Sequence, residues 1–392
     1  MDHPSTARRP RVGHTVAAAS VAALAVVAVS GAAVFGAAAT APTTATAVER
    51  SVTTAAPAGR VFGIGPGTNA QARMKAAMEA LRPGDTLKIY PGTYGLDLRP
   101  DLRFSRGTQA RRITVTAADP AHPPVLLGAV TLDRADWWVV SNLRIQGNLA
   151  RRDSLTMNSG TGWMVNGLEV TGAARTGAYA NVVITRINGW TTPTRWLFVN
   201  SCVHGGGVFP ESRRGQLHEI YVTSTGNNGN GLIARNTLFD TPFGAAVKIG
   251  NGGVPGAIGP DNVQVANNTL FSNGTQVLLF GRTTGNSVRG NLVVGSTRKL
   301  SNGRDTVGVY LNGLTRGPVG TRTNLVQQND FYNPSYPLYN LGSATGTFRN
   351  GGDNNVGAAP AFGSGGCAGL RPTEAHARLY GRYAARNLFT MP

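Results

Sequence analysis

The sequence predicts a right-handed parallel β-helix, an all-β solenoid of short strands. Glycine is abundant, with 52 residues, and only 14% of the residues are charged. This balance suits many tight turns between short buried strands. A unit of strand, asparagine turn, strand, short loop and strand recurs between residues 231 and 341. Sandwiches and propellers would instead show hairpin dipeptides and regular blade repeats.

The recurring corner of this unit is centred on asparagine. Asparagine tolerates the left-handed backbone that such a corner needs, and stacked amides can hydrogen-bond from coil to coil. Three strands per turn and about 4.8 Å between coils leave room for about ten coils between Thr86 and Leu341. The aligned corners are Asn236, Asn268, Asn291 and Asn329, with earlier equivalents expected at Asn142, Asn166 and Asn200.

A separate N-terminal unit precedes the solenoid. Arg8, Arg9 and Arg11 stand before an uncharged Ala/Val-rich run at 15–41, which is the layout of a signal peptide. We expect residues 1–47 to be this signal, residues 48–60 to be a flexible spacer, and the protein to be secreted. Because the apolar run is long enough to span a bilayer, an uncleaved membrane anchor is the alternative.

We expect a covering element at each end of the solenoid, which spans residues 61–342. Asn69 to Leu81 has apolar residues at helical spacing, and the Arg82-Pro83-Gly84-Asp85 run stops this helix before a first strand at Thr86. Residues 343–392 lose the repeat and predict a C-terminal cap with a short helix near 373–386. Such elements cover the apolar cross-section that a solenoid end exposes.

The charge and the cysteines limit the partners and the cross-links. The formal net charge is +18, but lysine and arginine are spread along the chain and no nucleic-acid-binding motif occurs. We therefore expect a monomer that meets an acidic polysaccharide or a cell-envelope polymer, and no nucleic acid; the charge could also serve solubility alone. Cys202 and Cys367 should lie several coils apart, which favours two buried thiols, and a single disulfide, permitted in an oxidising compartment, is the alternative.

Three stretches carry a family resemblance: GDTLKIYPGTY at 84–94, RGTQARRITVTA at 106–117 and WWVVSNLRIQG at 137–147. They resemble the N-terminal coils of the pectate-lyase-like superfamily, nearest to its chondroitinase B and alginate lyase type. The resemblance runs loosely from about Ala80 to Leu341. It implies β-elimination next to a uronate by a lysine base and an arginine, often with calcium on the carboxylate.

The chain departs from this family pattern at one position. The pattern places a lysine about nine residues before an Asn-Thr-Phe corner and an arginine in a following Leu-Arg-x-Gly strand. Here Asn236-Thr237-Leu238 forms the corner and Lys248 occupies the position of the arginine. Thr225 to Asn228 stands where the lysine would be, so the lysine and arginine pair is not reproduced.

Strand alternation gives an independent route to a site. If Ile220, Val247, Val277 and Val309 point inward, one outward column holds Tyr221, Lys248, Leu278 and Tyr310. Glu219 should then lie beside Lys248, where an acid and a base could act on a sugar. An ordinary surface ion pair is the alternative. The resulting catalytic candidates are Lys248, Glu219, Arg282 and His218, and the substrate-binding candidates are Tyr221, Tyr310, His204 and Glu211.

Other chemistries have less support in the sequence. Inverting hydrolysis needs two paired carboxyl groups, whereas Asp240, Asp261, Asp305 and Asp330 are isolated. No metal-ligand spacing is recognisable, no cofactor is assigned, and a calcium site built from scattered carboxylates stays open. The sequence thus favours an exported protein that binds an acidic polysaccharide, and it leaves open whether the protein also cleaves this polymer by β-elimination. The alternative is a non-catalytic solenoid of the cell envelope or of adhesion.

Overall fold

The computed structural model divides the chain into two units, Met1–Ala55 and Ala56–Pro392, and the described residues lie in the second. The expected signal peptide therefore lies outside the described residues. Within these, no helix combines the length and apolar character of a membrane crossing. The structure describes residues 58–95, 97–147, 152–173, 177–187, 189–206, 217–223, 229–250, 259–280, 283–295, 307–312, 324–332, 336–341, 348–350, 354–357, 362, 366–369, 380–382 and 384.

The described strands form three parallel sheets, A, B and C. Sheet A contains β1 (Val61–Ile64), β2 (Thr86–Ile89), β4 (Ile113–Ala117), β7 (Trp138–Ser141), β10 (Met164–Asn166), β13 (Leu197–Val199), β16 (Leu232–Ala234), β19 (Gln264–Ala266), β22 (Ser287–Arg289), β25 (Asn324–Gln327) and β28 (Phe348–Asn350). Sheet B contains β3 (Thr93–Gly95), β5 (Val125–Leu127), β8 (Arg144–Gln146), β11 (Glu169–Thr171), β14 (Cys202–His204), β17 (Thr237–Phe239), β20 (Thr269–Asn273), β23 (Leu292–Gly295), β26 (Asp330–Tyr332) and β29 (Asn355–Gly357). Sheet C contains β6 (Val130–Asp133), β9 (Leu155–Asn158), β12 (Ala180–Thr185), β15 (His218–Val222), β18 (Ala245–Gly250), β21 (Thr275–Phe280), β24 (Val307–Asn312) and β27 (Tyr336–Leu341).

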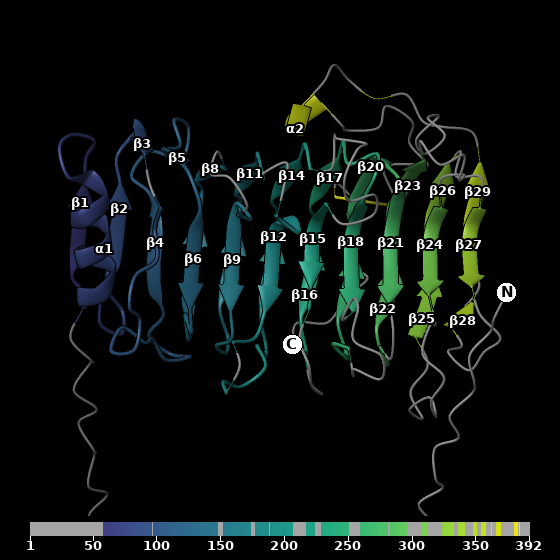
Figure 1. Cartoon of the computed structure of the whole chain (residues 1–392), viewed down its shortest axis with the longest axis horizontal. Helices are drawn as coiled ribbons and strands as arrows, with labels where there is room; N and C mark the ends of the chain where they lie inside the picture. Colours follow the sequence, from purple (N-terminus) through teal and green to yellow (C-terminus); the bar gives the residue numbers. More distant parts are fainter. Residues whose placement is uncertain are drawn as a thin grey trace, which may run out of the picture. The chain divides into compact units, whose positions relative to one another are not determined.

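The order of the strands confirms the predicted parallel β-helix. Along most of each sheet, neighbouring strands are three apart in sequence order, so every coil adds one strand to each sheet. The sheet C series from β6 to β27 can be followed across Figure 1. Because connections between parallel strands of one sheet are right-handed almost without exception, the coils wind in the predicted hand.

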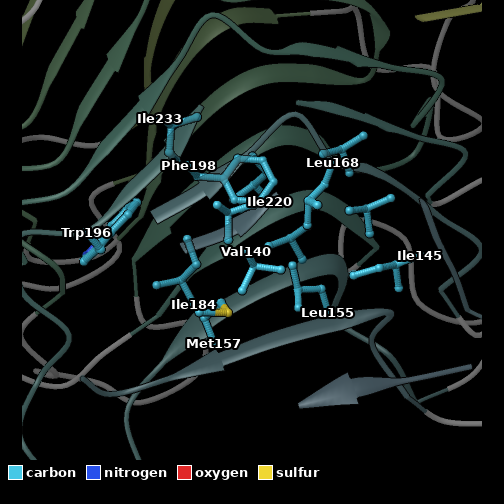
Figure 2. Close-up of a cluster of buried hydrophobic side chains, with 14 of the residues drawn as sticks. Val140, Ile145, Leu155, Met157, Leu168, Ile184, Trp196, Phe198, Ile220 and Ile233 are labelled. Atoms are coloured by element: carbon cyan, nitrogen blue, oxygen red, sulfur yellow. The ribbon is translucent and has the colours of Figure 1, made fainter. Parts of the chain in front are cut away.

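The interior is a continuous apolar core that runs from coil to coil. Ile220, Val247, Val277 and Val309 are fully buried, as strand alternation predicts. Side chains from all three sheets meet in this core, including Phe198 and Ile145 (Figure 2). Burial of this apolar surface is the main stabilising contribution to the fold.

The asparagine corners form a buried ladder. The side-chain oxygen of Asn268 accepts hydrogen bonds from the backbone N–H and the amide of Asn236, each at 3.0 Å. Asn268, Asn291 and Asn329 repeat the pattern toward the C-terminus. Stacking of the amides is thus confirmed. Every buried amide in the row gains a partner from the next coil.

Two details of this corner differ from the sequence interpretation. The left-handed residue is the one before each ladder asparagine; Arg235 and Asn267, for example, have φ of 56° and 54°. The coil before Asn236 contributes Ser201, whose N–H donates to Asn236 Oδ1 at 2.8 Å. Asn200 therefore precedes the ladder position, and Asn142 occupies the equivalent left-handed place.

The N-terminal end is covered by the predicted helix. Helix α1 (Ala70–Ala80) buries Met74 and Met78 against the first coils. The hydroxyl of Ser105 donates to the carbonyl oxygens of Met78 and Leu81, which satisfies acceptors at the end of the helix. Strand β1 precedes α1 and pairs with β2, so sheet A begins one strand earlier than Thr86.

The C-terminal segment returns along sheet B. Strands β28 and β29 continue the sheets beyond residue 342. A second helix, α2 (Gly366–Gly369), follows, and most of the helix predicted near 373–386 lies outside the described residues. We call Phe362, α2 and residues 380–382 the C-terminal strap. It contacts sheet B through Phe362 against Phe271 at 5.4 Å, and the Gly381 N–H donates to the carbonyl of Gly290, in the corner between β22 and β23.

Cys202 and Cys367 form a disulfide, with Cα atoms 5.7 Å apart, so the expectation of two thiols is wrong. The expectation assumed that residues far apart in a solenoid sequence lie on distant coils. The strap breaks this rule because it leaves the winding and places Cys367 against β14.

Candidate functional site

The outward face of sheet C carries the predicted column. Tyr221 pairs in register with Lys248, Lys248 with Leu278, and Leu278 with Tyr310. These four residues of the predicted column are thus in register along β15, β18, β21 and β24. We call these four residues the sheet C column.

Lys248 is held within this column in a largely desolvated position. Its side chain is 9% exposed, and its Nζ lies 4.5 Å from the centroid of the Tyr221 ring and 5.4 Å from that of Phe280. Within the described part of the chain, no carboxylate forms an ion pair with it. Burial lowers the pKa of Lys248 to about 8.

Glu219 does not join the column, which corrects both interpretations of this residue. It is fully buried, and its carboxylate accepts hydrogen bonds from Asn181 Nδ2 at 2.6 Å and from Gly206 N–H at 2.9 Å. Glu219 and Lys248, which are both described, form no ion pair with each other. Burial raises the pKa of Glu219 to about 8.

Glu219 points inward because the first residues of the sheet C strands do not alternate strictly between the two faces. Ala246 and Val247, which follow one another in β18, both belong to the main core cluster. Two consecutive residues therefore point inward at this place, and strict alternation fails. Glu219 and Ile220 hold the corresponding positions in β15.

His218 takes the outward place that Glu219 was expected to hold. Its ring lies 5.6 Å from that of Tyr221, and its Nδ1 accepts the backbone N–H of Ala245 at 2.9 Å. This bond assigns the proton of the neutral ring to Nε2, which has no hydrogen-bond partner in the structure. Burial, and then the nearby charge of Lys248, hold the pKa of His218 well below its ordinary value.

Tyr179 is a neighbour of the column that the sequence interpretation missed. Its ring lies 6.2 Å from that of Tyr221, and the residue is 51% exposed. It directly precedes β12, one coil before β15. The sequence feature that could have indicated Tyr179 is an aromatic residue directly before a strand of the sheet that carries the predicted column.

The other predicted site residues do not reach the column. His204 belongs to sheet B, where it stacks on Phe239 at 4.8 Å and its Nε2 lies 3.4 Å from Glu169 Oε1. Arg144 also bonds Glu169, at 2.9 Å. Arg282 and Glu211 lie outside the described residues.

The described residues offer little to a metal ion. Ligand atoms of Cys202, His204 and Cys367 lie within 4.8 Å of one another, but the disulfide leaves neither cysteine a thiolate to bind with. At the buried carboxylate of Glu219, Asn181 presents its amide N–H rather than its oxygen. Calcium prefers six to eight oxygen ligands, so this pair alone does not fit it.

Solved structures with similar architecture include several polysaccharide-degrading enzymes. A pectate lyase, Pel9A, has 14% identity and a TM-score of 0.49, with 75% of this chain and 82% of that chain covered. An alginate lyase from Paenibacillus sp. has 17% identity and a TM-score of 0.46, with 75% and 99% covered. The xylose complex of XylC has 11% identity and a TM-score of 0.49, with 76% and 69% covered.

These likenesses concern the fold. Three parallel sheets wound coil by coil are the parallel β-helix that the sequence predicts. No protein-family model and no curated protein matches the chain. The residues of the site therefore carry the functional argument.

Proposed function

We propose that this protein binds an acidic polysaccharide along the sheet C column and cleaves it by β-elimination, with Lys248 as the base. The observation that carries the proposal is the desolvated position of Lys248, whose pKa is lowered to about 8. Enzymes that use lysine as a general base lower its pKa to about 7–8 by burial. A lysine that serves solubility alone has no need of such a position.

In the proposed step, neutral Lys248 takes the proton from the carbon next to the uronate carboxylate. The bond from the adjacent carbon to the glycosidic oxygen breaks, a carbon–carbon double bond forms, and the leaving oxygen takes a proton. Tyr221, whose ring lies under Lys248 Nζ, is the candidate donor of this proton. The ring of His218, which carries its proton on Nε2, lies 5.6 Å from the ring of Tyr221 in the same cluster.

The expected pH dependence follows from the requirement for a neutral amine. Because the pKa of Lys248 is about 8, the neutral fraction, and with it kcat/KM, should rise about tenfold per unit from pH 6 to 8 and then level off. The measurement is absorbance of the unsaturated product on alginate, pectate and chondroitin, with and without calcium. A rate that is flat between pH 6 and 8 would exclude Lys248 as the base.

Substitution tests the same assignment. Lys248→Gln should lower kcat by at least about 100-fold, the contribution of a general base. Lys248→Arg should do the same, because a guanidinium does not give up its proton at these pH values. Lys88→Gln, which changes an exposed lysine of β2, is the matched control. If Lys248→Gln kept the rate of the Lys88 variant, the mechanism would be wrong.

A second candidate function is that of a non-catalytic solenoid that binds glycans or serves the cell envelope. The inward position of Glu219 favours it, because among the described residues no carboxyl group then stands beside Lys248 to act as an acid. Glycan arrays with the purified protein separate the two candidates. Binding without any unsaturated product supports the second.

We also propose that the protein is exported. The layout of residues 1–47, with three arginines before an apolar run, supports this. N-terminal sequencing of protein recovered from the culture medium tests it. A chain that stays inside the cells with its first 47 residues intact would contradict export.

A further inference from the structure

Tyr179 is one of four large apolar or aromatic residues that stand clearly exposed among the described residues, with Val61, Tyr90 and Phe104. Of these, Tyr179 alone contacts the cluster around the sheet C column, through Tyr221. Exposure of a large ring has a cost in water that a bound apolar surface would remove. Its place beside the candidate site therefore suggests a role in binding.

The backbone of Tyr179 is fixed to the scaffold on both sides. Asp153 Oδ1 accepts the N–H groups of Tyr179 and Ala180, at 2.7 and 3.0 Å. The carbonyl of Tyr179 accepts the N–H of His218 at 3.0 Å. The ring is thus presented from a fixed position, so binding would cost little conformational entropy.

Tyr179 and Lys248 flank Tyr221 on opposite sides. Tyr179 precedes β12, Tyr221 lies in β15 and Lys248 in β18, which are consecutive strands of sheet C. Two coil steps span about 10 Å along the solenoid. This distance corresponds to roughly two sugar residues of an extended chain, rather than to parts of one ring.

We propose that Tyr179 is a stacking platform for one sugar ring of a linear acidic polysaccharide that lies along sheet C, while the carboxylate of a uronate about two rings further along lies at Lys248. The proposal rests on the proposed function for its second half. An aromatic face offers apolar surface to the C–H face of a pyranose, as it does to other flat partners. Lys248 offers the positive charge that the carboxylate requires.

The test is direct binding of uronate oligosaccharides, measured by calorimetry on the Lys248→Gln background as well as on the unaltered protein. Tyr179→Ala should weaken binding about 3- to 10-fold, the range of a single aromatic stacking contact. Tyr179→Phe should bind as the unaltered protein does, since it keeps the ring. Tyr90→Ala removes a tyrosine that is 52% exposed and lies beside β2, far along the chain, and should change nothing.

The outcomes separate this inference from the proposed reaction. If no substrate is cleaved but oligouronates bind and Tyr179→Ala weakens binding, the platform stands and the lyase proposal falls. In an active protein, a raised KM with unchanged kcat for Tyr179→Ala supports the platform. If Tyr179→Ala binds as tightly as Tyr179→Phe, the platform is wrong, whatever becomes of the reaction. Failure of every oligouronate to bind the unaltered protein overturns both.

Discussion

At the scale of single residues, the inward carboxyl of Glu219 gives the fold a pH dependence. Its pKa is raised from an ordinary value near 4.5 to about 8 in the folded chain. The folded state then binds more protons than the unfolded state between these values. The stability contributed by this group is fully present below about pH 4.5 and is lost as the pH rises through about 8.

We therefore expect the free energy of unfolding to fall as the pH rises from about 6.5 to 8, above the range in which His218 acts in the opposite direction, and expect Glu219→Gln to flatten the slope. Denaturant unfolding at a series of pH values measures it. Equal slopes in the two proteins would show that Glu219 does not titrate as described.

Sequence patterns predicted part of the site at this scale. The column of Tyr221, Lys248, Leu278 and Tyr310 follows from period-two alternation, and the register confirms it. The side of Glu219 could not be predicted, because the irregular start of a sheet C strand depends on its packing against Asn181 and Gly206. Those partners are 38 and 13 residues away in sequence.

At the scale of elements, the asparagine ladder ties each coil to the next. Asn268→Ala would leave the N–H and amide of Asn236 without their acceptor and the carbonyl of Ile233 without its donor. Buried groups left in this way cost about 1–3 kcal/mol each. We expect a loss of at least about 3 kcal/mol in unfolding free energy, measured by guanidinium denaturation.

Asn166→Ala is the matched control for this prediction. Its side chain accepts only an exposed hydrogen bond from Asn200 Nδ2, at 2.8 Å. Water replaces such a bond readily, so the change should stay within about 1 kcal/mol. A comparable loss in both variants would show that the buried row has no special contribution.

The asparagine ladder also shows which features of a coil corner can be predicted from the sequence. The repeated asparagines predicted the corner and the stacking, since their side chains alone can bond along the coils. They did not predict which residue takes the left-handed backbone, because Arg235 and Gln328 do so as well as Gly290. Coil stacking evidently imposes that conformation on residues that do not favour it alone.

At the scale of the whole described unit, the strap is fastened by the disulfide and by Arg382. The guanidinium of Arg382 donates to Thr237 Oγ1 and to the carbonyl of Asn200, at 3.3 and 3.2 Å. The disulfide closes a loop of 165 residues. In the chain-entropy account, a loop of that size stabilises the folded state by on the order of 5 kcal/mol.

Replacing both Cys202 and Cys367 by serine should therefore lower the guanidinium midpoint of unfolding. Adding a dithiol reductant to the unaltered protein should lower it equally. Reductant should leave the double variant unchanged, since no other disulfide or free cysteine occurs in the chain. If the oxidised and reduced proteins unfolded at the same midpoint, the strap would have no stabilising effect.

The path of the strap could not be predicted from the repeat. Periodicity describes how each coil follows its predecessor, and it ends where the winding ends. Phe362 and Arg382 contact residues of β20 that lie 91 and 113 positions earlier in the sequence. Only the surface of the finished solenoid specifies where such a segment lies.

A stack of coils in which each touches only its neighbours can peel from its last turn inward, one coil at a time. The strap joins the tail to β14, β17, β20 and β23 together. The final turns cannot come away while that tether holds. Under tension, the coils from β14 to the C-terminal end should therefore unfold together in one step rather than one by one.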